Sequence, residues 1–479
     1  MTGPCPPLWT AEAVIAATGG RCDRDWRAFG VSIDSRTVVP GDLFVALRGP
    51  NFDGHGFVAA ALAAGAAAAL VSERPAGLSA GAPLLFCDDT FIALQNLGRA
   101  GRARTAATVI AVTGSVGKTG TKEALLRCLE AQAPTYATAG SLNNHWGVPL
   151  SLARLPADCH HGVLELGMNH AGEIGPLSRM VRPAVGLITT IAPAHLEFFA
   201  SVAAIADAKA ELFEGMDQGG TAILNRDNDQ FGRLERAARL AGVGHILSFG
   251  AADGADARLI ACRCEADASM VEAEIGGVRL AYSLSLPGRH LVMNSLGVLL
   301  AVRAAGADLE AAARTLAVLP PVKGRGVRRR VALESGAFTL IDESYNASPA
   351  AMEASFAVAG AVATGAGGRR LAVLGDMREL GTAADDLHGA LAGPLVAAGF
   401  DQVFCCGPHM RALYVSLPER VRGAYAEHAG ALATVVAAAV RGGDVVLVKG
   451  SAGSRMGGVV AALAALDESQ AAAAAAAIS

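Results

Sequence analysis

A short glycine-rich loop between an apolar run and a helical stretch is the feature that most constrains this chain. Residues 113–122 read TGSVGKTGTK; they follow the apolar run 109–112 and lead into the predicted helix 122–129. Gly114 and Gly117 let the backbone approach phosphate oxygens with its N–H groups pointing at them. The strand–loop–helix order therefore predicts a phosphate-binding loop on a parallel sheet.

The side chains of this loop suit a nucleoside triphosphate. Lys118 would bring a cation to the β- and γ-phosphates, the Thr119 hydroxyl can bind Mg²⁺, and Ser115 and Val116 complete the loop. The first glycine of the usual motif would fall at position 112, where this chain has Val112. A chance Gly-Lys-Thr in an ordinary loop is the alternative, but the flanking strand and helix favour ATP binding.

The length and composition of the chain are typical of a globular protein with several domains. The 479 residues suggest about three domains, and 52% hydrophobic with 18% charged residues can form large cores. A formal charge of −4 argues against a nucleic-acid partner. We find neither a long apolar span nor a signal sequence, so we expect a cytoplasmic protein without membrane insertion. The nine scattered cysteines lack zinc-ligand spacing and indicate free thiols.

The order of apolar runs predicts an α/β protein with three domains, at residues 1–106, 107–322 and 323–479. A Pro, Gly and Arg cluster at 320–330 marks the second boundary. In a small first domain we expect strands at 43–47 and 69–71 and a helix at 57–64. A central parallel sheet would contain the strands 108–112, 162–166, 185–189 and 221–224. The strands of the third domain would be 338–342, 370–374, 402–406 and 444–448. Short alternating segments at 259–286 predict an antiparallel addition, followed by a helix at 290–304.

Three further residues are candidates for chemistry. Glu165 ends a predicted strand beside the loop, where a carboxylate can hold Mg²⁺ or simply form part of an edge. His195 follows another strand at the ligand-binding edge of the sheet, although a lone histidine is more often an ordinary polar residue. Lys209 borders the apolar helical face of Ile205 and Leu212. Its ammonium either reaches solvent, or the amine is buried, has a lowered pKa and can react with CO₂ to give an anionic metal ligand.

An ordered set of motifs carries a more specific resemblance. Besides the loop, the chain contains LELGMNHxGEI at 164–174, AHLE at 194–197, AKAELF at 208–213, DESYNASP at 342–349, LGDMxELG at 374–381 and VKGS at 448–451. In this order and spacing, from residue 34 to residue 451, the chain resembles the Mur ligase family.

The resemblance implies a site built from several segments. Lys118 would contact ATP phosphates, and Thr119 and Glu165 would hold one Mg²⁺. His195 would bind a second metal ion beside a carbamylated Lys209. The residues implied to approach the nucleotide from elsewhere in the chain are Asn294, at the adenine, and Arg325 and Asp342, from the third domain. Without the resemblance, Arg325 is one solvated linker cation among several and Asp342 an ordinary strand-end carboxylate.

The resemblance also implies the substrates. The first domain would bind UDP through Asp34, Ser35 and Arg36, and Asn143 and Asn144 would face the sugar-peptide, although such residues also favour turns. The implied reaction, in peptidoglycan precursor synthesis, is ATP-dependent addition of D-alanyl-D-alanine to UDP-N-acetylmuramoyl-tripeptide through an acyl phosphate. We expect a monomer. The alternatives are another amino-acid ligase of this family and a regulatory ATPase with a phosphate-binding loop.

Overall fold

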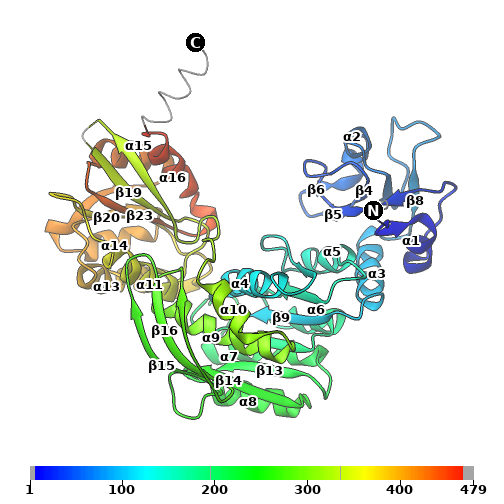
Figure 1. Cartoon of the computed structure of the whole chain (residues 1–479). Coiled ribbons are helices and arrows are strands. Elements are labelled where there is room, and N and C mark those ends of the chain that lie inside the picture. The colour runs from blue at the N-terminus through cyan, green and yellow to red at the C-terminus, as the bar shows by residue number, and fades with distance from the viewer. Residues whose placement is uncertain (1–5, 195, 335, 468–479) are drawn as a thin grey trace.

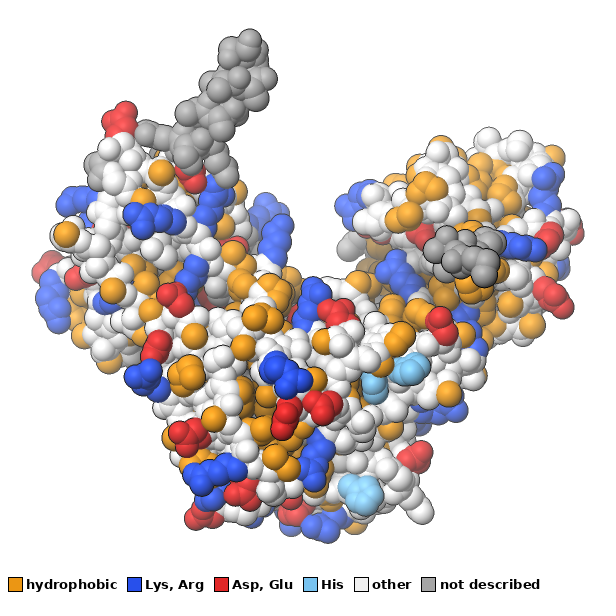
Figure 2. Space-filling view, viewed as in Figure 1, with side chains coloured by type: hydrophobic (Ala, Val, Ile, Leu, Met, Phe, Trp, Pro, Cys, Tyr) orange, Lys and Arg blue, Asp and Glu red, His pale blue; other side chains and the backbone are white. Residues whose placement is uncertain are grey.

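Three α/β units follow one another along the chain. The computed structural model describes residues 6–194, 196–334 and 336–467. In Figure 1 the central unit forms the base of a V, and the first and third units are its two arms. The space-filling view shows open space between the arms above the central unit (Figure 2). This three-unit α/β architecture agrees with the fold class expected from the sequence.

The first unit is a small parallel sheet flanked by helices. Its strand order is β3-β4-β7-β8, with bounds β3 Gly30–Ser32, β4 Asp42–Val45, β7 Ala68–Val71 and β8 Leu84–Phe86. The helices are α1 Ala11–Thr18, α2 Val58–Ala63 and α3 Thr90–Ala103. The two expected strands are present, and the expected helix at 57–64 is confirmed as α2, which a 3₁₀ turn at Gly54–Phe57 precedes.

The central unit contains a nine-stranded sheet that is parallel except at one end. Its order is β10-β11-β9-β12-β13-β14-β15-β16-β17, and only the pairs β15–β16 and β16–β17 are antiparallel. The bounds are β9 Thr108–Thr113, β10 Thr135–Ala137, β11 His161–Glu165, β12 Val185–Ile188, β13 Thr221–Asn225, β14 His245–Gly250, β15 Ala257–Cys264, β16 Ser269–Ile275 and β17 Val278–Leu284. The four expected strands and the antiparallel addition are confirmed.

Helices cover both faces of the parallel part of this sheet, where β9, β11 and β12 are buried on both sides, whereas β16 alternates buried and exposed residues. Val109 and Ala111 of β9 pack into one core, and Ile110 and Val112 pack into the other, as the alternation of side chains along a strand requires. The helices are α4 Lys118–Glu130, α5 Gly147–Ala153, α6 Ile174–Val181, α7 Val202–Ala210, α8 Phe231–Leu240, α9 Arg289–Ala304 and α10 Leu309–Leu316. The phosphate-loop helix α4 begins at Lys118, four residues before the predicted start.

The helix α5 also completes the core of the first unit. Leu150 and Ala153 belong to the apolar cluster that contains Trp9 and Leu94. The Trp9 indole Nε1 donates a hydrogen bond to the Ala153 carbonyl at 2.8 Å. The first two units are therefore joined by a shared core as well as by the chain.

The third unit has a six-stranded sheet in the order β18-β19-β23-β20-β21-β22, in which only β18 is antiparallel to its neighbour. The strands are β18 Val327–Leu333, β19 Gly336–Glu343, β20 Arg370–Gly375, β21 Gln402–Cys406, β22 Arg422–Ala426 and β23 Val445–Lys449. The longer helices are α11 Pro349–Gly360, α14 Met410–Ser416, α15 Ala429–Ala439 and α16 Gly457–Ala464. All four expected strands of this unit are present.

Among the helices of the described residues, none is both long enough and apolar enough to cross a membrane.

Candidate active site

The glycine-rich loop lies between the end of β9 and the start of α4, and its two critical glycines have backbone angles that favour glycine. The φ angle is 146° at Gly114 and 88° at Gly117. A Cβ atom on Gly114 would lie 2.0 Å from the Thr189 Oγ1 atom. The loop therefore has the shape of a phosphate cradle, with its N–H groups at the beginning of a helix.

The segment that follows the neighbouring strand β12 holds this cradle in place through the Thr189 side chain and the Ala192 backbone. The Thr189 hydroxyl donates to the Val116 carbonyl at 2.6 Å. The Ser115 hydroxyl donates to the Ala192 carbonyl at 3.0 Å and accepts from the Ala192 N–H at 3.1 Å. We did not single out Thr189 from the sequence; its place at the carboxyl end of a strand was the available signal.

Lys118 folds back over the loop. Its Nζ atom donates to the Gly114 carbonyl at 2.7 Å. Burial lowers the pKa of Lys118, the nearby Glu165 carboxylate opposes this shift, and the Arg325 guanidinium reinforces it. A bound phosphate would supply the anion that this amine lacks in the protein alone.

The buried Thr119 and Glu165 and the partly buried Asn143 form a network at the same edge of the sheet. The Thr119 hydroxyl donates to Glu165 Oε2 at 2.8 Å, and the Asn143 amide donates to Glu165 Oε1 at 2.7 Å. Hydroxyl and carboxylate oxygens are the donors that Mg²⁺ prefers, so Thr119 and Glu165 fit this ion. No group of three or more His, Cys, Asp or Glu side chains in the described parts of the chain could hold a metal ion. Substrate phosphate and water would have to supply the remaining ligands.

Arg325 reaches this network from the third unit. Its Nη2 atom donates to Thr119 Oγ1 at 3.1 Å, and its guanidinium carbon lies 4.4 Å from the centre of the Tyr345 ring. Asp342 instead accepts hydrogen bonds from the backbone N–H of Ser344 at 3.0 Å and its hydroxyl at 2.6 Å. The structure thus brings one of the two predicted third-domain residues to the phosphate loop and places the other in an adjacent turn.

Lys209 is buried on α7, with 1% of its surface exposed. Burial lowers its pKa well below the ordinary value, and the positive charge of Lys118 adds to the shift. Its amine makes no hydrogen bond or ion pair with another described residue. The structure therefore matches the buried alternative for Lys209 rather than the solvent-exposed one. His195, the residue predicted to act beside it, lies outside the described residues.

Asn294 packs against the phosphate loop from α9. A Cβ atom on Gly117 would lie 2.6 Å from the Asn294 Nδ2 atom. The close approach places this predicted adenine residue directly beside the loop.

The predicted substrate residues of the first unit form a local turn. The Asp34 carboxylate accepts from the Arg36 guanidinium at 2.6 Å, and this interaction lowers the pKa of Asp34; Ser35 lies between them. The Asn144 side-chain oxygen accepts from the N–H groups of Trp146 and Gly147 at the start of α5. Asn143 thus belongs to the network with Glu165, whereas Asn144 closes a turn at the start of α5.

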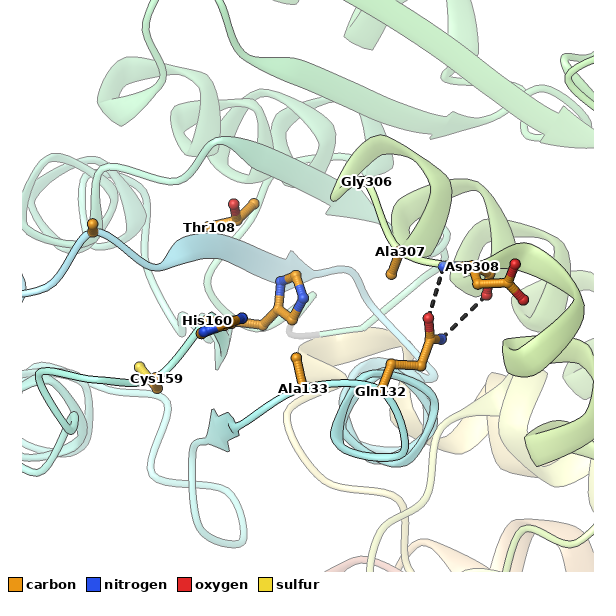
Figure 3. Close-up of a pocket in the computed structure, with 10 residues that line it drawn as sticks. Thr108, Gln132, Ala133, Cys159, His160, Gly306, Ala307 and Asp308 are labelled. Carbon is orange, nitrogen blue, oxygen red and sulfur yellow. Dashed lines mark hydrogen bonds between the residues drawn. The ribbon is translucent and has the colours of Figure 1, made fainter.

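A separate cavity of about 500 Å³ lies at the opposite, amino-terminal edge of the central sheet. It is lined by the start of β9, the segment after α4, and Asp308. Figure 3 shows the Gln132 side chain directed at Asp308, whose backbone N–H and C=O it binds at 2.7 and 3.2 Å. Because nucleotides bind at the carboxyl ends of parallel strands, this cavity is not the nucleotide site.

The phosphate cradle, the Thr119–Glu165 oxygen pair and the arginine from another domain define an enzyme that uses a nucleoside triphosphate across a domain boundary. Three segments match family descriptions: residues 28–94 match "Mur ligase family, catalytic domain", residues 112–302 "Mur ligase middle domain" and residues 328–452 "Mur ligase, glutamate ligase domain". The chain belongs to the Mur ligase family, whose members are ATP-dependent ligases.

Individual relatives cover nearly the whole chain. A UDP-N-acetylmuramoyl-tripeptide–D-alanyl-D-alanine ligase of Rickettsia prowazekii is 31% identical over 94% of this chain and 98% of its own length. The ligase of the same name from Escherichia coli is 37% identical over 80% and 82%. A crystal structure of MurF from Acinetobacter baumannii has a TM-score of 0.82 at 31% identity and covers 96% of this chain and 100% of its own. A MurF ligase from Thermotoga maritima, solved in complex with ADP, has a TM-score of 0.76 at 26% identity and covers 92% and 98%.

Proposed function

We propose that this chain joins D-alanyl-D-alanine to UDP-N-acetylmuramoyl-tripeptide at the expense of ATP, in peptidoglycan precursor synthesis. The observation that carries the proposal is identity of 31–37% with ligases of this name over most of the chain. The intact phosphate loop and its contact with Arg325 support the same reaction. We place the enzyme in the cytoplasm, where ATP and the nucleotide-linked precursor are available, and propose that it acts as a monomer.

The reaction proceeds in two transfers. A carboxylate oxygen of the tripeptide attacks the γ-phosphorus, ADP leaves, and an acyl phosphate forms. The amine of D-alanyl-D-alanine then attacks the acyl carbon, the amide bond forms, and phosphate leaves while the amine loses a proton. Lys118 binds the phosphoryl oxygens, and Arg325 approaches them from the third unit. Asn294 would contact the adenine, and Asp342 would lie near the nucleotide once the domains close.

Thr119 and Glu165 are the residues that would hold Mg²⁺. When bound, the ion supplies charge neutralisation at the phosphoryl oxygens. Asn143 keeps the Glu165 carboxylate oriented through its 2.7 Å hydrogen bond, which leaves the second oxygen at Thr119.

We propose that Lys209 is carbamylated and, with His195, holds a second Mg²⁺. A neutral amine is required, because its lone pair attacks the carbon of CO₂ and the nitrogen then releases a proton to solvent. Burial of Lys209 and its lowered pKa favour that neutral form. The product is an anionic oxygen ligand in place of a cation, and it suits Mg²⁺.

The domain arrangement suits a reaction with three substrates. We propose that the first domain (1–106) holds the UDP part through Asp34, Ser35 and Arg36, the central domain (107–322) holds ATP, and the third (323–479) brings the dipeptide. Asn143 and Asn144 would face the sugar-peptide between them. The arms stand apart in Figure 2, so the third domain would close to exclude water from the acyl phosphate.

Release of ADP from ATP tests the proposal. We expect release to require both the tripeptide precursor and D-alanyl-D-alanine. Release with a single amino acid in place of the dipeptide would indicate another ligase of the family. Slow release that neither substrate accelerates would indicate a regulatory ATPase and contradict the proposal.

A further inference from the structure

We infer that Tyr345 is a positioning residue that couples the substrate-side loop 138–144 to the phosphate-binding loop. Its ring orients Arg325 toward Thr119, and its hydroxyl ties this arrangement to Ser141. The inference deepens the proposed function, because it assigns a coupling role within the same site.

The first contact is between the ring and the guanidinium. The Arg325 guanidinium carbon lies 4.4 Å from the ring centre of Tyr345, within the range of a cation–π contact. The same guanidinium donates to the Thr119 hydroxyl. A long arginine side chain has many rotamers, so an aromatic face that fixes it favours the conformer that reaches Thr119.

The second contact joins the Tyr345 hydroxyl to the central unit at Ser141. The Tyr345 hydroxyl donates to the Ser141 hydroxyl at 2.5 Å, across 204 residues of sequence. Ser141 lies two residues before Asn143, whose amide binds Glu165 at 2.7 Å. One contact of Tyr345 therefore leads through Arg325 to Thr119. The other leads through Ser141 and the nearby Asn143 to Glu165, the hydrogen-bond partner of Thr119.

The third unit holds Tyr345 in place by local interactions. The Tyr345 N–H donates to the Gly324 carbonyl at 3.2 Å, and Gly324 has a φ angle of 72°. A Cβ atom at Gly324 would lie 3.0 Å from the Tyr345 Cβ atom, so the two backbone segments pack closely. The turn that carries Tyr345 is closed by the hydrogen bonds from Ser344 to Asp342. The tyrosine is thus presented by a structured turn and can transmit a displacement of either loop.

The Tyr345 side chain lies at the surface and is not part of an apolar core. Tyr345 is 38% exposed, so its replacement leaves no buried cavity. Neither of its two contacts contributes to the apolar core of the third unit. Loss of coupling can therefore be measured without loss of the fold.

The test measures binding of β,γ-imido-ATP with Mg²⁺ to the full chain by titration calorimetry. Tyr345→Leu removes both contacts, and we expect about threefold to tenfold weaker binding, as a lost cation–π contact predicts. Tyr414→Leu is the matched control, because Arg422 lies over the Tyr414 ring at 5.9 Å in the same unit. It should bind the analogue within about twofold of the parent. Equal affinities of the two leucine variants would overturn the role of the ring.

A double-mutant cycle tests the link to Ser141. Tyr345→Phe and Ser141→Ala each remove one partner of the same hydrogen bond, so each should weaken analogue binding about twofold to threefold, and the double variant should be no weaker than either. A double effect equal to the product of the single effects, or two silent single variants, would overturn the coupling. These affinities do not require ligation, so they test Tyr345 even if the proposed peptide substrates are wrong. If ligation is observed, the KM for the tripeptide should rise in both single variants while kcat changes less.

Discussion

The Arg325 guanidinium donates a hydrogen bond to the Thr119 hydroxyl across 206 residues of sequence. Thr119 also donates to Glu165, so one hydroxyl connects the third unit to the carboxylate of the central sheet. The third unit therefore touches the phosphate-binding loop directly, through a side chain that stands at the start of α4.

Replacement of Arg325 tests this contact. We expect Arg325→Ala to lower the rate of ligation by about tenfold or more, because a cation near the phosphoryl oxygens is lost. Arg328→Ala is the matched control, since Arg328 bridges the same two units through Asp267 at 2.6 Å, away from the loop. Steady-state ADP release measures both variants. If they are equally impaired, Arg325 serves only to join the domains.

Lys118→Ala should nearly abolish ligation and leave the fold intact. The amine lies over the loop at the Gly114 carbonyl, and we propose that it binds phosphate there. Loss of such a charge at a phosphoryl-transfer site costs on the order of a hundredfold or more in rate. Turnover and melting temperature should be measured together. Near-normal turnover at saturating ATP would contradict the assignment.

The proposed carbamate predicts a specific pattern of rescue at Lys209. Lys209→Ala should lose activity, and short carboxylic acids that fit the vacated space should restore part of it. Lys209→Arg should stay inactive, because it keeps a positive charge and cannot supply an oxygen ligand. Activity assays with and without added acetate or formate decide the point. An arginine variant as active as the parent would rule out the carbamate.

The buried amine of Lys209 also predicts how stability depends on pH. Its folded pKa lies well below the ordinary value of 10.5, so between these two values the unfolded chain binds a proton that the folded chain does not. The free energy of unfolding therefore rises with pH through this window. Lys209→Met removes the effect, so it should be more stable than the parent at pH 7, with a difference that shrinks toward pH 10.5. Urea unfolding at several pH values, without bicarbonate or metal, measures it; a pH-independent difference would contradict the burial argument.

The shared helix α5 predicts a strong effect of Leu150→Ala. Leu150 lies in the core of the first unit, with 2% of its surface exposed. Truncation of a buried leucine costs about 2–5 kcal/mol. Leu240, which is 84% exposed, offers a control whose replacement by alanine should change stability by less than about 0.5 kcal/mol. Denaturant unfolding of the two variants gives the comparison. A cost for Leu150 as small as that of the control would show that α5 does not stabilise the first unit.

The sequence predicted the parts of this site that depend on local pattern. The phosphate loop and its strand could be identified because glycines, a lysine and an apolar run stand together in the chain. The 3.6-residue repeat placed Lys209 beside an apolar helical face but left its burial open, and the structure shows the side chain buried. Contacts between distant segments leave no such local pattern, so the hydrogen bonds from Thr189 to Val116 and from Tyr345 to Ser141 were not predicted.

Asn144 shows a different limit of sequence reasoning. Asparagine suits both a substrate contact and a helix N-terminus, and only the structure shows its side-chain oxygen accepting hydrogen bonds at the start of α5. The domain boundaries at 106 and 322 and the roles of Asn294, Asp342 and the first-unit turn stay predictions. Each depends on a bound substrate or on the behaviour of separated fragments.

The position of α5 has a consequence for recombination between members of this family. A crossover near residue 106 would separate Leu150 and Ala153 from the Trp9 and Leu94 side chains that they cover. Chimeras that exchange the first domain should therefore inherit the segment through residue 155 from the same parent, because the Arg104 guanidinium also binds the Leu155 carbonyl at 2.8 Å. The segment to be exchanged is thus longer than the first domain, which we propose binds UDP, and it includes the loop with Asn143. A chimera that acquires a new nucleotide-sugar specificity in this way would therefore also acquire Asn143, the residue that binds Glu165, from the same parent.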